Sequence, residues 1–208
     1  MLIAISIPEL TQASSKVFYI QGEAVQGEKK IKAVGEILEE KVVISTQSDS
    51  ILGIEFKDGS RVKIPPSSRV KILKSAGEVE LQLVRGRIFS KVKKSEVSDK
   101  SHFKIRSQSA VMGVRGTEFF ASVDEQSHDL WMCVNEGKVE ISSEGTAKPI
   151  LVPAGLGVFA PTGKLITEPK PFAWTKKLNW NMDPSQGEIQ DETVIPKYSA
   201  NLLKQQYD

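Results

Sequence analysis

Cysteine and histidine are scarce in this chain, which has one cysteine and two histidines among 208 residues. A lone thiol, Cys133, cannot form an intrachain disulfide. His102 and His128 are the only histidines, and no Cys-x-x-Cys, His-Glu-x-x-His or glycine-rich phosphate loop is present. The sequence therefore predicts no metal site, no cofactor and no enzymatic activity.

Long apolar runs and a strong charge of one sign are also missing. No stretch approaches the ~18 consecutive apolar residues of a membrane-spanning helix, so no transmembrane segment is expected. The chain has 28 Lys and Arg against 26 Asp and Glu, a formal charge of +2, which gives no overall preference for nucleic acid or membranes. A hydrophobic content of 39% is typical of a globular chain, and the length favours one domain with extensions.

The N-terminus has some features of an export signal. A short apolar stretch over residues 2–7 is followed by small residues that would accept cleavage after Ala13. No Lys or Arg precedes the stretch, and it is shorter than the roughly 7–15 residues of a signal core. Residues 1–15 are therefore interpreted either as a truncated signal or as a flexible N-terminus.

Alternation of apolar and polar residues runs from Val17 to about Ala160 and predicts short, half-buried strands. The clearest hairpin pairs residues 51–56 with 61–64 around Asp58-Gly59, which favours a tight primed turn. Its buried face would hold Ile54, Phe56, Val62 and Ile64. Two more strand-turn-strand units are expected at 79–92 and 130–141, with turns at 85–87 and 135–137.

These patterns predict a mainly β fold over residues 16–160, a single domain of short, mostly antiparallel strands in a rolled or sandwich-like stack. Residues 161–208 form an irregular or helical extension, because five of the ten prolines and two of the three tryptophans lie there and the alternation ends. Its aromatic residues either pack the extension back on the β domain or serve to dock a partner.

The most distinctive stretches are an apolar strand entering Val-Arg-Gly-Thr-Glu-Phe at 114–119 and Val-Asn-Glu-Gly-Lys-Val at 134–139. With the 56–60 hairpin and the 83–88 segment, they resemble the FecR family domain over roughly residues 17–157. The motif residues that carry this resemblance are Arg115, Gly116, Thr117, Glu118, Phe119, Glu136 and Gly137.

The resemblance implies an all-β domain on the periplasmic or outer side of the cell envelope. The best-known members relay an outer-membrane receptor's signal to a sigma factor, with an anti-sigma helix bundle and a membrane span before the domain and a signalling module after it. None of these three is recognisable here. The expected function is therefore that of a stand-alone, non-catalytic envelope interaction or signalling module that binds a protein or polymer, with a cytoplasmic location as the alternative if no signal peptide exists.

Within the motif, Arg115 and Glu118 flank Gly116 and are expected to form an ion pair that joins adjacent strands. The structural interpretation of this pair is favoured over a recognition site for a ligand carboxylate or phosphate.

Basic residues concentrate between residues 60 and 108, where 13 Lys and Arg face four acids, a net charge of +9. Strand parity directs six of them away from the core. If the strands that carry these six residues are neighbours, the residues form a basic stripe that would bind an anionic envelope polymer. A second hypothesis is that this stripe makes the protein a polyanion-binding protein. Otherwise the six residues are a solvated strand face. Few aromatic residues alternate with them, so nucleic acid is not favoured. The six are Arg61, Lys63, Arg69, Lys71, Lys104 and Arg106.

Overall fold

The computed structural model describes residues 15–94, 101–172, 175 and 180, and within them the chain forms fifteen strands and no helix. No described segment is thus a helix long and apolar enough to span a membrane. The strands are β1 (Ser15–Gln21), β2 (Ala24–Gln26), β3 (Lys29–Ile31), β4 (Val43–Thr46), β5 (Ile51–Phe56), β6 (Arg61–Ile64), β7 (Arg69–Lys74), β8 (Val79–Val92), β9 (Phe103–Arg106), β10 (Val111–Val114), β11 (Thr117–Val123), β12 (Leu130–Glu136), β13 (Lys138–Ser142), β14 (Ile150–Pro153) and β15 (Gly157–Ala160).

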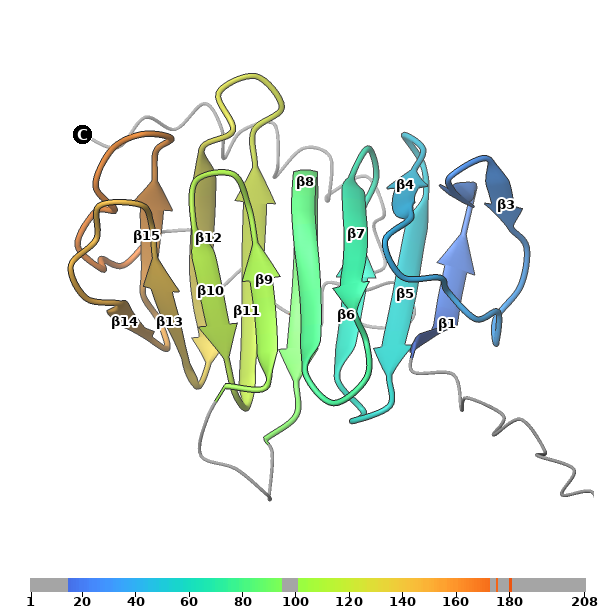
Figure 1. Cartoon of the computed structure of the whole chain (residues 1–208), viewed down its shortest axis with the longest axis horizontal. Helices are drawn as coiled ribbons and strands as arrows, with labels where there is room; N and C mark the ends of the chain where they lie inside the picture. Colours follow the sequence, from blue (N-terminus) through green and yellow to red (C-terminus); the bar gives the residue numbers. More distant parts are fainter. Residues whose placement is uncertain (1–14, 95–100, 173–174, 176–179, 181–208) are drawn as a thin grey trace, which may run out of the picture.

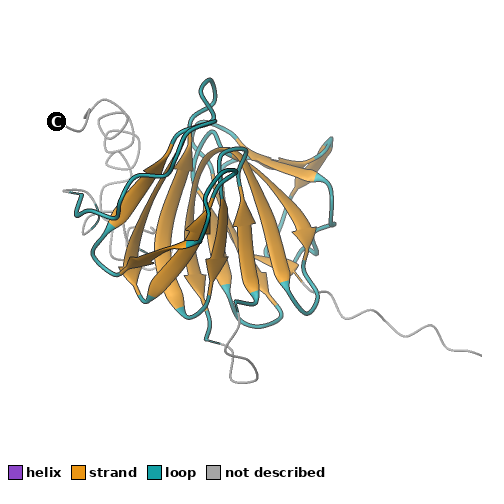
Figure 2. Cartoon of the chain, turned by 60° about the vertical axis from the view of Figure 1, so that its left-hand side comes forward, coloured by secondary structure: helices purple, strands orange, loops and turns teal. Residues whose placement is uncertain are grey.

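Two layers of strands lie face to face and share the long strand β8 (Figures 1 and 2). Layer A has the order β1-β5-β6-β8-β11-β12-β15, and layer B has the order β14-β13-β10-β9-β8-β7-β4-β2-β3. Neighbouring strands are antiparallel except β8 and β9, which are parallel. The core lies between the layers, where the rings of Phe56 from layer A and Phe103 from layer B meet edge to face at 5.6 Å. The predicted mainly β, sandwich-like class is confirmed.

The hairpin predicted at residues 51–64 is present, with Leu52 opposite Ile64 and Ile54 opposite Val62. All four residues predicted for its buried face lie in the core. The turn differs from the prediction, because the backbone N–H of Phe56 donates to the carbonyl of Ser60 and closes a three-residue loop. Only Gly59 of that loop has a positive φ, so the turn is not the primed type.

The strand-turn-strand unit expected at 79–92 is instead one continuous strand. The first half of β8 pairs with β7 and β9 in layer B, and the second half pairs with β6 and β11 in layer A. At the change of layer, Gly86 has φ +81°, and a Cβ atom there would lie 2.5 Å from Ser68 Oγ. The Ser68 hydroxyl accepts a hydrogen bond from the backbone N–H of Arg87, so the loop that precedes β7 holds the bend in place.

The unit expected at 130–141 is likewise not a hairpin. Strand β12 pairs with β11 and β15 in layer A, whereas β13 pairs with β10 and β14 in layer B. The chain crosses between layers at Gly137, and it makes the reverse crossing from β10 to β11 at Gly116. The glycines of the sequence motif therefore mark corners where the chain changes layer.

The outer face of layer A is covered by residues from the C-terminal segment. Phe172 and Trp180 are buried against Phe89, Phe120 and Cys133, in a cluster separate from the main core. Lys63 donates a hydrogen bond of 2.8 Å to the Trp180 carbonyl, and Asn135 donates to the carbonyl of Thr175. We call Phe172, Thr175 and Trp180 the C-terminal cover. Residues 1–14 and 181–208, which include most of the predicted signal and much of the predicted extension, lie outside the described part.

Candidate functional site

The two motif corners pack against each other. A Cβ atom on Gly137, whose φ is +79°, would lie 2.9 Å from Thr117 Oγ1 and closer still to the Gly116 carbonyl oxygen. The buried Thr117 hydroxyl lies 2.8 Å from the Lys138 carbonyl and 3.0 Å from the Arg115 carbonyl, so it links the chain on both sides. The Thr-Glu-Phe and Glu-Gly segments therefore pack with their backbones in close contact. Only glycine at position 137 leaves room for this close approach.

The structure gives Glu118 a partner other than the Arg115 expected from the sequence. Glu118 instead forms an ion pair of 2.5 Å with Lys91, which lies directly opposite it on the neighbouring strand β8. Parity explains the difference: Glu118 points out of layer A with Phe120, whereas Arg115 precedes the crossing at Gly116. Phe119 points the other way and is a core residue.

A surface groove of about 620 Å³ lies beside the Gly116 corner. Its walls are the β5–β6 hairpin, the end of β8 and the motif itself. We call it the corner groove; it is lined by Glu55, Gly59, Arg61, Lys91, Val92, Lys93, Lys94, Gly116, Thr117, Glu118 and Glu136. It brings Arg61 from the predicted basic set together with four of the seven motif residues.

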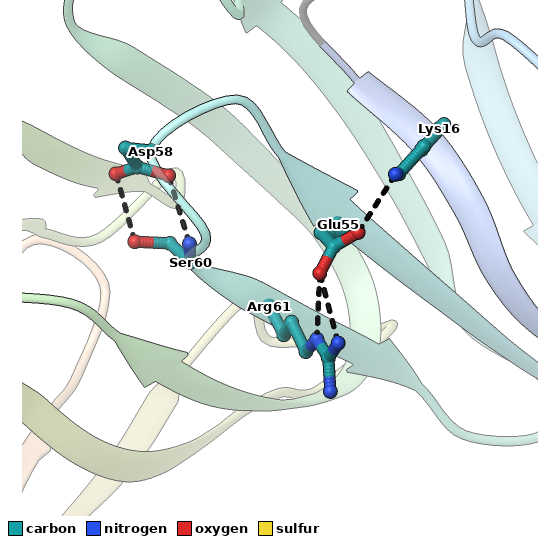
Figure 3. Close-up of polar contacts among 5 residues, drawn as sticks. All are labelled: Lys16, Glu55, Asp58, Ser60 and Arg61. Atoms are coloured by element: carbon teal, nitrogen blue, oxygen red, sulfur yellow. Dashed lines mark hydrogen bonds and ion pairs between the residues drawn. The ribbon is translucent and has the colours of Figure 1, made fainter.

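One wall of the groove is held by the carboxylate of Glu55 (Figure 3). Its Oε1 accepts hydrogen bonds from Nε and Nη2 of Arg61 at 3.0 and 2.8 Å, and its Oε2 lies 3.1 Å from Lys16 Nζ. The hydrogen bonds from Arg61 and then from Lys16 lower the pKa of Glu55, against the opposing effect of burial. Glu55 is thus ionised and neutralised by two cations.

The hairpin tip at the groove is also fixed by hydrogen bonds. Asp58 accepts the backbone N–H and the hydroxyl of Ser60, each at 2.8 Å (Figure 3), and the Ser60 hydroxyl accepts the backbone N–H of Lys93. His102 Nε2 lies 3.1 Å from Asp58, which connects the tip to the start of β9. The groove wall is therefore rigid and preorganised.

Three exposed charges of the groove make no ion pair within the described residues. Lys93, Lys94 and Glu136 are exposed, whereas Glu55 and Glu118 are neutralised by neighbours. Two cations and one anion are thus available to a ligand. Lys93 and Lys94 belong to the basic segment found in the sequence, but nothing in the sequence indicates that they border the motif. The end of β8 lies beside the motif only because β8 pairs with β11.

The six basic residues predicted to form one stripe are divided between two faces. Arg61 and Lys63 lie on the outer side of layer A, and Lys63 is only 3% exposed because Trp180 lies over it, its ring centroid 3.7 Å from Nζ. The other four lie on the outer side of layer B, on strands separated by β8. The expectation of a single stripe is therefore wrong in its geometry. Those four are Arg69, Lys71, Lys104 and Arg106.

Acidic residues on β8 and just before it lie between the basic strands of layer B. Glu78 is 3.8 Å from Lys74 and 3.7 Å from Lys104, and Glu80 pairs with Arg106. These pairs reduce the positive potential of that face, which fits the alternative of a solvated strand surface.

The described part of the chain shows neither a metal-holding group nor a reactive thiol. No group of three or more His, Cys, Asp or Glu side chains there is arranged to hold a metal ion. Cys133 lies beneath the C-terminal cover, and burial raises the pKa of its thiol far above the ordinary value, so it is not a nucleophile.

Comparison with known families gives the identity of the β domain. The family model described as FecR protein matches residues 42–140. Residues 42–140 are a FecR domain. The match begins just before β4 and ends within β13, and it includes both motif corners and all residues of the corner groove. The family that the motif indicates is thereby confirmed.

Two crystal structures of a candidate anti-sigma factor from Parabacteroides distasonis resemble this chain, each with a TM-score of 0.53 and 17% sequence identity. Each comparison covers 64% of this chain and 61% of the other, so this chain spans less than two thirds of that protein. At this identity the likeness concerns the fold. No match was found among curated protein sequences.

Proposed function

We propose that this chain is a non-catalytic interaction or signalling module of the cell envelope, and that its FecR domain binds a protein partner at the corner groove. The observation that carries the proposal is the set of exposed charges of both signs on a rigid wall at the family motif. Lys93, Lys94 and Glu136 supply these charges, and the Glu55 and Ser60 contacts hold the wall in place.

A protein surface fits this groove better than a uniform polyanion does. An acidic polymer would gain from Lys93 and Lys94 but would be repelled by Glu136, whereas a protein can present an acid and a base in register. The family assignment supports the same view, because a FecR domain is a part of regulatory proteins in the best-known cases. The polyanion hypothesis has weaker support, since its six residues are divided between two faces and four of them are paired with acids or covered.

We further propose that the protein is exported to the periplasm or the outer side of the envelope. The family and the cleavage context at Ala13 support export. Cell fractionation with N-terminal sequencing of the native protein tests it. A new N-terminus near Ser14 in the periplasmic fraction is expected, and recovery of only the intact chain from the cytoplasm would leave the cytoplasmic alternative.

Site-specific photo-crosslinking in the native cells tests the groove. A crosslinking amino acid at Lys94 is expected to yield one defined protein adduct, which mass spectrometry identifies. The matched control is Lys148, an equally exposed lysine in the loop between β13 and β14, away from the groove. The same adducts at both positions, or none at Lys94, would count against docking at the groove.

A further inference from the structure

Arg87 lies on the outer face of layer A and has no counter-ion among the residues that the structure describes. It is half-buried, and its side chain makes no ion pair or hydrogen bond with any residue of the described ranges. Burial lowers the pKa of its guanidinium, although an arginine remains protonated at neutral pH. Arginine side chains that are removed from water are normally paired with an acceptor. Arg87 is an exception within the described residues.

Two further donors lie beside Arg87 on the same face. Ser122 on β11 is directly opposite Arg87 on β8, and Trp131 on β12 is directly opposite Ser122. Ser122 is only 7% exposed, and its hydroxyl makes no hydrogen bond to the described residues. The indole Nε1 of Trp131 is shielded from solvent and likewise has no acceptor in the part of the chain that the structure describes. Three adjacent strands thus present three donors that have no acceptor among the described residues.

The described carboxylates of β11 and of the loop that follows it are already engaged elsewhere. Glu118, further along β11, pairs with Lys91, and Glu125 in the following loop pairs with Arg85. Asp124 accepts the backbone N–H groups of Gln126 and Ser127 at 2.9 and 2.8 Å. None of these three carboxylates can pair with Arg87 without breaking an existing contact.

We propose that Arg87 and Ser122 form a binding site for the carboxylate of an acidic peptide side chain, beside the ring of Trp131. The planar fork of arginine matches a carboxylate with two parallel hydrogen bonds, and the hydroxyl of Ser122 donates to one of its remaining lone pairs. Phe159 packs against Trp131 with the two rings tilted and 4.4 Å between their centroids, and it supplies an apolar wall. The site is separate from the corner groove and does not depend on the function proposed for that groove.

The test follows the indole N–H resonance of Trp131 in the full chain by two-dimensional ¹H–¹⁵N NMR. The chain has three tryptophans, and Trp131→Phe identifies the signal. Titration with N-acetyl-glutamate amide at constant ionic strength should shift it in a saturable way, whereas neutral N-acetyl-glutamine amide should not. Arg87→Gln should abolish the shift, and Arg87→Lys, which keeps the charge and loses the fork, should weaken binding roughly tenfold.

Arg69→Gln is the matched control, because Arg69 is an exposed arginine on the outer face of layer B. It should bind like the wild type. The proposal is overturned if the glutamate probe shifts nothing, if the glutamine probe shifts the signal equally, or if Arg87→Gln retains the shift. If Arg87→Gln fails to fold, the Arg87→Lys titration decides.

Discussion

Gly137 provides the most direct check on the packing of the two motif corners. A methyl group at this position would have to occupy space held by the Gly116 carbonyl and Thr117 Oγ1, the latter 2.9 Å away. Both obstacles belong to the other corner, and one of them is backbone. We therefore expect Gly137→Ala to force the corners apart.

The expected loss has two parts. The positive φ of +79° costs an L-residue about 1–2 kcal/mol, and forcing atoms into a filled site costs about 1–3 kcal/mol more. The sum is about 2–5 kcal/mol, and for a chain of this size each kcal/mol lowers the Tm by roughly 2–4 °C.

Gly155→Ala separates the two parts. Gly155 has a similar φ of +84°, but an added Cβ there would meet nothing within 4 Å. It should lose only the backbone part, about 1–2 kcal/mol. Urea and thermal unfolding followed by circular dichroism measure both variants. Equal losses for Gly137→Ala and Gly155→Ala would refute the argument that close approach of the corners requires glycine.

Three further results are expected. Thr117→Val should destabilise the fold by about 1–3 kcal/mol in urea unfolding, because the buried hydroxyl bonds to backbone groups of both corners; a wild-type midpoint would contradict this. The folded-state pKa of Glu55 is lowered, so its ion pairs contribute fully above the ordinary pKa of 4.5 and lose their contribution as the pH falls through the lowered value. The stability deficit of Glu55→Gln should therefore shrink on acidification, and a deficit that grows below pH 4.5 would reverse the sign of the argument. Charge reversal of three layer B residues should change retention on an acidic polysaccharide column only slightly across a salt series, because acids on and near β8 already lie among these residues. A complete loss of retention would instead support the polyanion hypothesis. The three residues are Arg69, Lys71 and Lys104.

Local pattern was enough to predict most strands and one complete hairpin. Alternation placed Ile54, Phe56, Val62 and Ile64 correctly on the buried face, because the period of two is imposed by the strand itself. The errors at Gly86 and Gly137 have a common cause. A glycine between two apolar runs permits either a hairpin turn or a change of layer, and only the pairing of distant strands decides between them.

The prediction for the site failed where burial depends on remote residues. Lys63 follows the parity of an outward residue, and it does point outward, but Trp180 from 117 positions later covers it. Glu118 was assigned to Arg115 by proximity in sequence, whereas its partner Lys91 is adjacent only across β8 and β11. The groove joins three segments in the same way, so its lining could not be read from any one of them.

The measurement that tests the proposed function most directly is crosslinking from a fixed position while the groove charges are reversed. A photo-crosslinker at Lys57, exposed at the tip of the β5–β6 hairpin beside the groove, reports the partner in native cells. The account predicts that Lys93→Glu with Lys94→Glu removes the adduct while the Tm stays close to that of the wild type, because both side chains are exposed. An adduct of undiminished yield in this folded double variant would contradict docking at the corner groove.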